Sequence, residues 1–435
     1  MNLNILKLKH HLTDPLYRNS LFLMTSTAVL TGLGFFFWMV VARYYSEYEV
    51  GVSAAIISVI NLLAIISSLG LGSAITRFLP KAENPVGMIN SSFIICGIFA
   101  LVVTGIFLAG IDVFSKEINF IVDHIIFLLA FVVFTVCRPI TILLGAIFVA
   151  KRRAEFTLVK NSIFAALKIP LPILLVMSLH AFGIVGSWGI AASIALVVSL
   201  FIFLPRIQRD YKPTLKINWD IMKLMWKYSA GSYLARIFFS APALILPIII
   251  VNNIGPEHNA YFYVAWTISS LLFEISHATA RSLFAEGSHF EERLAPDVRR
   301  SFKFIAMLLI PAMILVVLLG KWLLLLFGES YSDNALKLLW ILAFSSPFIA
   351  VNSIYTSILR VQYRIKELIA LRASVAITVL VASALITPYV GITGTGYVWT
   401  GIQALVSVYA GLLIRVRYRA MKAANKSFTN RLDED

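Results

Sequence analysis

Long apolar runs joined by short loops constrain this chain more than any single motif does. Twelve runs can be read along the sequence, and each approaches or exceeds the roughly 20 residues that a helix needs to cross the hydrocarbon core of a bilayer. They predict transmembrane helices at 20–42, 52–76, 88–111, 121–149, 158–179, 183–204, 228–251, 260–284, 303–327, 335–358, 367–387 and 391–414.

Basic residues are distributed unequally between the two sets of alternating loops. If the N-terminus is cytoplasmic, thirty of the 37 Lys and Arg residues fall on the cytoplasmic side, and the outer loops hold only Arg43, Lys116, Lys321 and Lys337. Lys and Arg are enriched in the cytoplasmic loops of membrane proteins. The sequence therefore predicts a multi-pass protein of the cell membrane with both termini in the cytoplasm.

Composition excludes several other classes of protein. The chain has 435 residues, of which 59% are hydrophobic and 14% charged, so a soluble multidomain protein is excluded. The net charge of +15 lies mostly in short loops beside the spans, where contact with anionic lipid headgroups explains it better than nucleic acid does. Cys96 and Cys137 both lie inside spans and are interpreted as small apolar residues rather than a disulfide.

The predicted spans divide into two groups of six. The longest break between spans in the first two thirds of the chain runs from Pro205 to Lys227, and an even number of spans on each side gives a parallel repeat about an axis along the membrane normal. We expect an N-terminal six-helix lobe (1–205), a cytoplasmic linker with a short interfacial helix (206–227), and a C-terminal six-helix lobe with a basic tail (228–435). The expected fold is thus all-α.

Charged residues inside spans are costly and mark functional positions by default. Arg138 and Lys168 lie fifteen residues before and after a turn near Arg153, so antiparallel spans bring both cations to one depth. The first six spans contain no interior carboxylate to neutralise them. We therefore expect the two cations to bind an anion in the cavity between the two lobes.

The second half carries a different set of polar residues. Glu274 is expected at the depth of Arg236, where the two would form either a stabilising ion pair or a switch. Glu274, His277 and Arg281 are spaced to share one helix face, and we interpret them as gating or coupling residues. Arg43 and Arg77 lie at span ends, where they either snorkel to the surface or form a secondary cationic entrance to the cavity.

No motif of an enzyme is present. The sequence lacks an HExxH motif, a P-loop, a glycine-rich nucleotide fingerprint and a nucleophile elbow. We expect no catalytic residues, no metal and no cofactor.

Two segments resemble a known family. One runs from Tyr17 to Lys81 and includes Gly70-Leu71-Gly72-Ser73-Ala74-Ile75-Thr76-Arg77-Phe78-Leu79-Pro80, and the other is Ala280-Arg281-Ser282-Leu283-Phe284-Ala285-Glu286. Together with the six-plus-six pattern, they are similar to polysaccharide and O-antigen flippases, which export oligosaccharidyl lipids. These flippases belong to the superfamily that also contains multidrug antiporters.

The resemblance implies two six-helix lobes around a cationic central cavity that opens alternately to each side. The implied substrate is an oligosaccharide on a polyprenyl pyrophosphate carrier, held by Arg138, Lys168 and Arg236. Membrane lipids and the polysaccharide polymerase machinery are the implied partners, and no nucleic acid is expected. Three alternatives remain open: an ion-coupled multidrug antiporter of the same fold, a membrane glycan polymerase or ligase, and a flippase for a different lipid-linked precursor.

Overall fold

The computed structural model describes residues 15–289 and 294–432, and every regular element in these ranges is helical. Eleven helical stretches in the described ranges are long and apolar enough to cross a membrane. The predicted all-α polytopic membrane fold is therefore confirmed. The remaining predicted span, 260–284, lies within the 34-residue helix α13 (Pro256–His289), which is not among the eleven and carries Glu274, His277 and Arg281 along its length.

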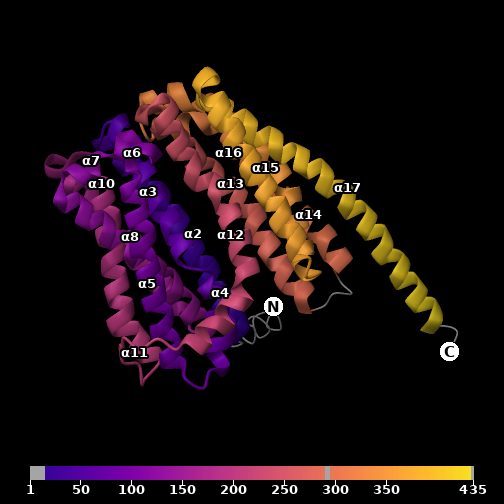
Figure 1. Ribbon diagram of the computed structural model, residues 1–435. Coiled ribbons are helices and arrows are strands. Elements are labelled where there is room, and N and C mark those ends of the chain that lie inside the picture. The colour runs from indigo at the N-terminus through magenta and orange to yellow at the C-terminus, as the bar shows by residue number, and fades with distance from the viewer. Residues whose placement is uncertain (1–14, 290–293, 433–435) are drawn as a thin grey trace, which may run out of the picture. The chain divides into compact units, whose positions relative to one another are not determined.

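The chain forms two compact units, Met1–Glu257 and His258–Asp435. Unit 1 begins with the long helix α2 (Pro15–Tyr44) and the buried helix α3 (Glu47–Ser67), against which α5, α8, α10 and α12 pack (Figure 1). Its further helices are α4 (Leu71–Phe78), α5 (Pro85–Ala109), α6 (Ile111–Phe114), α7 (Phe120–Asp123), α8 (Ile125–Ala150), α9 (Ala154–Leu167), α10 (Leu171–Val198), α11 (Leu204–Ile207) and α12 (Trp219–Ile254). Short turns η1 (Leu79–Lys81), η2 (Lys116–Ile118) and η3 (Ser199–Phe203) complete it.

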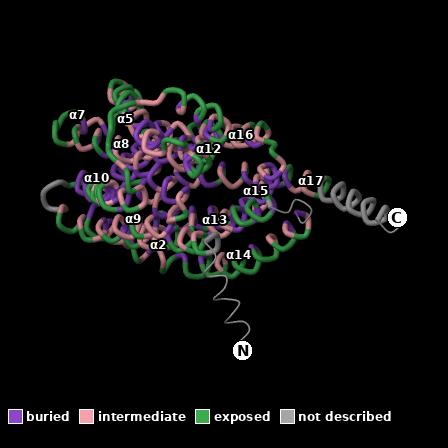
Figure 2. Tube along the Cα trace, turned by 90° about the horizontal axis from the view of Figure 1, so that it is seen from below, coloured by how far each residue is buried: buried purple, intermediate pink, exposed green. Residues whose placement is uncertain are grey.

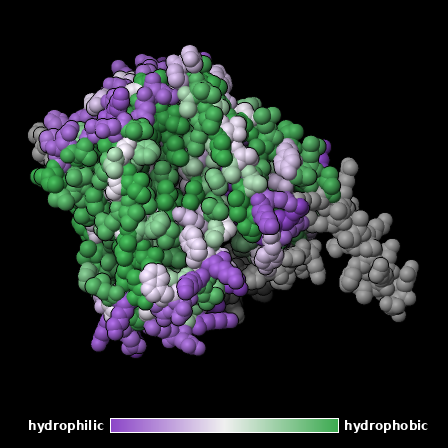
Figure 3. All heavy atoms as spheres, viewed as in Figure 1, coloured by the Kyte–Doolittle hydropathy of each residue, from purple (hydrophilic) through white to green (hydrophobic). Residues whose placement is uncertain are grey.

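Burial identifies α3 as the centre of unit 1. In the 18-residue apolar stretch of α3, 78% of the stretch is buried, compared with 28% in the corresponding stretches of α5 and α8. Helix α3 therefore faces protein, and its neighbours also face lipid. In unit 1, buried residues lie between the packed helices, and exposed residues lie at its periphery (Figure 2). On the visible face of unit 1, hydrophobic residues fill the middle and hydrophilic residues gather at the two ends, as a membrane protein requires (Figure 3).

Local capping fixes the beginnings of three unit-1 helices. Ser46 and Glu49 form a reciprocal capping box at the start of α3, which satisfies two backbone donors. Asn84 caps α5 just before Pro85, and Asn218 caps α12. These caps set the short turns that let neighbouring spans run antiparallel.

Two predicted spans are not continuous helices. The span at 52–76 breaks between α3 and α4, where Leu69 and Gly70 have φ angles of 50° and 69°. Tyr233 of α12 donates a 2.6 Å hydrogen bond to the carbonyl of Ile66 beside this break, and a Cβ on Gly70 would lie 2.7 Å from the Tyr233 Cβ. The second break separates α9 from α10. It follows from Pro170 and Pro172, which cannot donate backbone hydrogen bonds.

A kink at His180 (φ 45°), inside the run assigned to α10, separates the fifth and sixth spans.

The linker after the sixth span differs from the expected interfacial helix. Residues 212–218 have no regular structure, and Asn90 of α5 holds them through the carbonyl of Lys212 and the hydroxyl of Thr214, at 2.8 and 3.0 Å. The amphipathic segment that follows is the first part of α12. Its Met222 and Met225 enter the hydrophobic core of unit 1, while Trp219 and Trp226 remain exposed.

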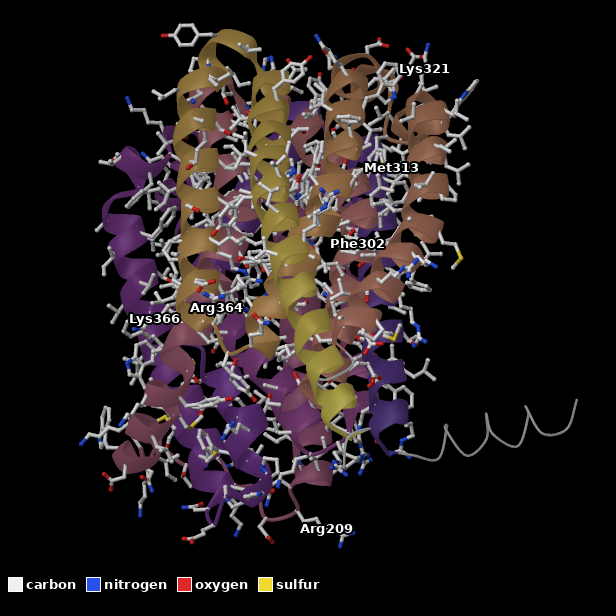
Figure 4. The ribbon with its side chains drawn as sticks, turned by 90° about the vertical axis from the view of Figure 1, so that its right-hand side faces the viewer. Arg209, Phe302, Met313, Lys321, Arg364 and Lys366 are labelled. Carbon is white, nitrogen blue, oxygen red and sulfur yellow. The ribbon has the colours of Figure 1, made fainter. Side chains whose placement is uncertain are left out.

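Unit 2 contains most of α13 and four further helices: α14 (Leu294–Leu325), α15 (Glu329–Val361), α16 (Ile365–Val390) and α17 (Ile392–Leu432). The buried helix α15 is its centre, with α14, α16 and α17 packed against it. Figure 4 shows Phe302, Met313 and Lys321 in order along α14, with Lys321 at the end away from Arg364 and Lys366. Lys321 and the Arg364–Lys366 turn thus lie at opposite ends of unit 2, as the predicted alternation of loops requires.

Candidate functional site

Arg138 lies midway along α8 and is held by two neighbouring helices. Its Nε donates a 2.9 Å hydrogen bond to Oδ1 of Asn61 on α3, and its guanidinium carbon lies 5.4 Å from the centre of the Trp188 ring on α10. The Asn61 amide nitrogen donates in turn to the carbonyl of Ile57, at 2.8 Å, which fixes the orientation of the amide. The guanidinium is therefore positioned by a neutral acceptor and an aromatic ring.

Lys168 lies at the break between α9 and α10. Its side chain is buried, with Nζ 5.1 Å from the ring centre of Phe37 on α2 and 5.0 Å from that of Phe164. The cation follows the last turn of α9, where helix carbonyls favour positive charge. Gly34 of α2 lies beside the ammonium group, since a Cβ there would be in van der Waals contact with Nζ at 3.8 Å.

Aromatic side chains connect these two cations. The ring of Phe164, which contacts Lys168, lies 6.0 Å from that of Trp188, which contacts Arg138. The charge of Arg138 acts electrostatically on Lys168. The structure thus brings Arg138 and Lys168 into one cluster, in which rings face the two charges.

Lys160 was not among the residues predicted for the site, but the structure adds it to the cluster. Lys160 is buried on α9, and its Nζ donates a 3.1 Å hydrogen bond to the carbonyl of Thr141 on α8. A Cβ on Gly145 would lie 3.7 Å from this Nζ, in ordinary van der Waals contact, so Gly145 lies directly beside the ammonium group. Thr141 and Gly145 follow Arg138 by three and seven residues, so they share its face of α8. This stripe of small residues was the sequence feature that could have indicated a close helix contact at this position.

We call Arg138, Lys160 and Lys168 the unit-1 cation cluster. No member forms an ion pair in the described part of the chain. Acidic residues within the candidate spans of unit 1 occupy only the first turns of their helices: Glu47 and Glu49 in α3, Glu155 in α9, and Asp220 in α12. Three desolvated cations without a carboxylate can stabilise an anionic ligand through charge-assisted hydrogen bonds.

Three further predicted residues belong to unit 1. Arg236 is exposed on α12, and its charge acts on Arg138. Arg77 stacks on Tyr228 of α12, with its guanidinium carbon 4.8 Å from the ring centre. Arg43 is exposed in the last turn of α2. Because α2 and α3 run antiparallel, Arg43 and Arg77 lie near opposite ends of unit 1.

In unit 2, the predicted gating residues contact one another and α15. Arg281 Nη2 lies 3.0 Å from Glu274 Oε2, so Glu274 forms an ion pair within its own helix. His277 Nδ1 lies 3.1 Å from the hydroxyl of Ser353. The expected pairing of Glu274 with Arg236 would join the two units and stays a prediction.

Metal ligation was also considered from the geometry. In residues 15–289 and 294–432, no three His, Cys, Asp or Glu side chains gather where they could hold a metal ion. Cys96 and Cys137 are both free thiols.

Comparisons with family models match two parts of the chain. The model described as "Polysaccharide biosynthesis protein" matches residues 16–284, and the model described as MatE matches residues 243–385. A comparison with curated proteins gives no match.

Solved structures share the fold at low sequence identity. An inward-facing multidrug resistance MATE transporter of the MOP superfamily has a TM-score of 0.73 at 16% identity, covering 91% of this chain and 95% of its own. The inward closed lipid II flippase MurJ has a TM-score of 0.69 at 16% identity, covering 91% and 87%. A MOP superfamily transporter from Pyrococcus furiosus, whose "reverse polarity of binding pocket suggests different function", has a TM-score of 0.64 at 16% identity and coverages of 95% and 98%.

The family match extends over more than half of the chain and includes every residue of the unit-1 cation cluster. The structural likeness extends over nearly the whole chain. The chain therefore belongs to the polysaccharide biosynthesis protein family.

Proposed function

We propose that this protein is a flippase that moves polyprenyl-pyrophosphate-linked oligosaccharide from the inner to the outer leaflet of the cell membrane, for surface polysaccharide synthesis. The observation that carries the proposal is the unit-1 cation cluster, in which Lys160 and Lys168 are buried, Arg138 is half-buried, aromatic rings face Arg138 and Lys168, and no member has an ion pair in the described chain. A pyrophosphate supplies the negative charge that such a cluster lacks.

In this proposal, Arg138 and Lys168 bind the pyrophosphate or an acidic sugar, and Lys160 adds positive potential from the α9 side. Arg236 contributes further positive charge from α12. The polyprenyl chain stays in the hydrocarbon while the polar head crosses, so the protein removes the cost of moving the charged group through lipid. Transport then needs no catalytic residue and no cofactor.

Alternating access is the proposed mechanism. MATE family transporters with this fold have been solved in an inward-facing and in an outward-facing conformation. Glu274, His277 and Arg281 would act as the gating residues in unit 2, and Arg43 and Arg77 would attract the anion toward the cluster from opposite ends. Both termini are placed in the cytoplasm by the distribution of Lys and Arg, and polymerase machinery at the outer face would consume the product.

The MatE match and the MATE structures favour a second candidate, an ion-coupled multidrug antiporter. A cationic drug would meet like charge at the unit-1 cation cluster, because the acidic residues of the described unit-1 spans lie only in first turns. The Pyrococcus furiosus transporter is described as having a binding pocket of reverse polarity, which suggests that polarity separates functions on this fold. The positive charge of the unit-1 cation cluster favours an anionic substrate.

Deletion of the gene in its own host tests the proposal. Lipid-linked oligosaccharide is quantified by leaflet, and the strain is complemented with wild type, with Arg138→Ala/Lys168→Ala, or with Arg209→Ala/Lys212→Ala. The control pair also removes one Arg and one Lys, but from exposed positions beside the linker (Arg209, Figure 4). We expect complete units to accumulate on the cytoplasmic face and to be cleared by wild type and the control only.

Two other results would contradict the proposal and favour a different function. Accumulation on the outer face would indicate a polymerase or ligase that acts after translocation. No accumulation, combined with increased drug sensitivity of the deletion strain, would favour the antiporter.

A further inference from the structure

Helices α4 and α12 of unit 1 meet at three stacked side chains. The guanidinium carbon of Arg77, in the last turn of α4, lies 4.8 Å from the ring centre of Tyr228 on α12 and 5.9 Å from that of Phe78. The two rings meet edge to face, with their centres 5.3 Å apart. We call Arg77, Phe78 and Tyr228 the Arg77 stack.

Core packing holds the Arg77 stack in place. Its neighbours Leu79 and Met225 are both buried in the hydrophobic core of unit 1. They lie next to Phe78 and three residues before Tyr228, respectively. Further along α12, Tyr233 donates a hydrogen bond to the carbonyl just before the α3–α4 break. The two rings therefore have fixed positions, and the guanidinium that lies against them is already oriented.

The edge of the Arg77 guanidinium is open to a ligand. Arg77 is exposed, and it forms no ion pair in the part of the chain that the structure describes. A ring that contacts the face of a guanidinium leaves the N–H groups, which point outward in the plane of the group. These groups match two oxygens of a phosphate, to which they can donate parallel hydrogen bonds.

Exposed apolar side chains adjoin this cation on α12. Leu224 lies one helical turn before Tyr228, so the two share a face, and they are 55% and 44% exposed. Trp226 lies between them in the sequence and is 43% exposed. Trp and Tyr are enriched at the level of lipid headgroups, where part of the ring is apolar and part is in water. A phosphate that carries apolar chains therefore fits this surface better than a free phosphate does.

The chain around the start of α12 carries an excess of positive charge. From Arg206 to Tyr228 it holds six Lys or Arg residues and two Asp residues, all of them exposed. Among the six, Lys223 and Lys227 lie one turn apart on α12. The distribution of Lys and Arg predicts that this end of unit 1 faces the cytoplasm, where the surface of the leaflet is negative. Charge complementarity thus favours an anionic phospholipid over a zwitterionic one.

We propose that the Arg77 stack binds the headgroup of an anionic phospholipid, with Lys223 and Lys227 adding positive potential and Leu224 contacting the start of an acyl chain. The phospholipid belongs to the leaflet and is not transported, so the inference does not depend on the proposed flippase function. A substrate phosphate that Arg77 attracts would compete with this lipid at the same guanidinium. Polyprenyl phosphate therefore serves as a competitor in the test.

Native mass spectrometry of the full-length purified protein measures retention of phosphatidylglycerol against phosphatidylcholine. Arg77→Gln/Lys227→Gln is compared with Arg364→Gln/Lys366→Gln, which also removes one Arg and one Lys from exposed positions, but in unit 2 (Figure 4). We expect wild type and the control to prefer phosphatidylglycerol. The preference should fall about tenfold or more in the Arg77/Lys227 variant, because two cations beside the lipid surface are lost.

The Tyr228 ring separates an oriented guanidinium from diffuse positive charge. Tyr228→Phe keeps the ring and should bind phosphatidylglycerol as wild type does, whereas Tyr228→Leu keeps an apolar side chain and should bind it about threefold or more weakly. Equal binding by Tyr228→Leu and wild type would overturn the site. Equal retention of the two lipids by wild type would also overturn it, as would an Arg77/Lys227 variant that binds like wild type. Displacement of phosphatidylglycerol by an equal amount of polyprenyl phosphate would overturn the assignment to a phospholipid.

Footprinting of the wild type remains decisive if the variants do not fold. Phenylglyoxal modifies accessible arginines, and mass spectrometry reads each position. Phosphatidylglycerol, but not phosphatidylcholine, should protect Arg77 and leave Arg364 unchanged, and an unprotected Arg77 would refute the site. Arg138→Gln/Lys168→Gln should leave this protection intact even when transport is lost, which separates the inference from failure of the proposed flippase function.

Discussion

The charged side chains inside unit 1 and unit 2 differ in how their charge is balanced. In unit 1, Arg138 and Lys168 face a neutral amide and aromatic rings, and no member of the cluster forms an ion pair in the described chain. In unit 2, Glu274 already pairs with Arg281, and both side chains are partly exposed. Burial of a charge without a counter-charge is costly. The unit-1 cation cluster therefore indicates a bound ligand more strongly than the partly exposed Glu274–Arg281 pair does.

Placing a carboxylate inside the unit-1 cation cluster should give the largest effect. Lys168→Glu would create an internal ion pair with Arg138 and remove the need for a ligand, so we expect transport to fall about a hundredfold or more, roughly 3 kcal/mol. Leaflet-resolved quantification of lipid-linked oligosaccharide in the complemented deletion strain measures this. Lys168→Arg keeps the charge and should retain most activity; equal activity of the Glu and Arg variants would contradict the comparison.

Removing the neutral hydrogen-bond acceptor of Arg138 should reduce transport by an intermediate amount. Asn61→Leu deletes the 2.9 Å hydrogen bond to the guanidinium but no charge. A hydrogen bond to a charged group contributes about 1.5–3 kcal/mol, so we expect transport to fall about tenfold or more while the protein still folds. The same transport assay measures it, and Asn252→Leu, which loses an exposed bond to the carbonyl of Phe114, is the control. Unchanged transport would show that Asn61 does not position Arg138.

Replacing a buried cation by an apolar side chain of similar length should stabilise the fold. For Lys160→Met we expect the free energy of unfolding to rise by about 1–2 kcal/mol, because the ammonium group has one hydrogen bond to Thr141 and no ion pair. Thermal unfolding of the purified protein measures this, with exposed Lys366→Met as the control. A lower unfolding temperature for Lys160→Met alone would mean that Lys160 is structurally satisfied.

The smallest effect is expected in unit 2. Glu274→Gln breaks the pair with Arg281, but both side chains are more than a third exposed, so the free energy of unfolding should change by less than about 1 kcal/mol. The same unfolding measurement applies, with Glu286→Gln, an exposed residue on the same helix, as the control. A large loss of stability would show that the Glu274–Arg281 pair stabilises the fold, and the contrast with the unit-1 cation cluster would be lost.

Particular residues show how far the sequence could predict the site. Counting residues around a short turn predicts Arg138 and Lys168 at one depth, and in the structure Phe164 and Trp188 connect the two cations. Lys160 was missed because it lies close to the same turn, where a lysine is normally solvated, whereas the structure buries it on α9 with its ammonium group on the carbonyl of Thr141. The aromatic link through Phe164 and Trp188 depends on contact between α9 and α10, which spacing does not encode.

The fold was predictable to a similar degree. Apolar periodicity and loop charge located the spans, but the break at Leu69 and Gly70 depends on contact with Tyr233, which lies more than 160 residues further along the chain. Glu274 pairs with Arg281 on its own helix, a contact within unit 2 that depth counting did not indicate, and its expected pairing with Arg236 of unit 1 stays a prediction. Pairing partners follow side-chain direction, and depth alone does not supply it.

Reconstitution tests the role of the unit-1 cation cluster most directly. Purified protein is placed in liposomes loaded with the polyprenyl-pyrophosphate-linked oligosaccharide of its own host, and the fraction of glycan that reaches the outer leaflet is measured over time. The account predicts movement with wild type and with Arg209→Ala/Lys212→Ala, but none above protein-free liposomes with Arg138→Ala/Lys168→Ala. Equal movement by wild type and Arg138→Ala/Lys168→Ala would contradict it.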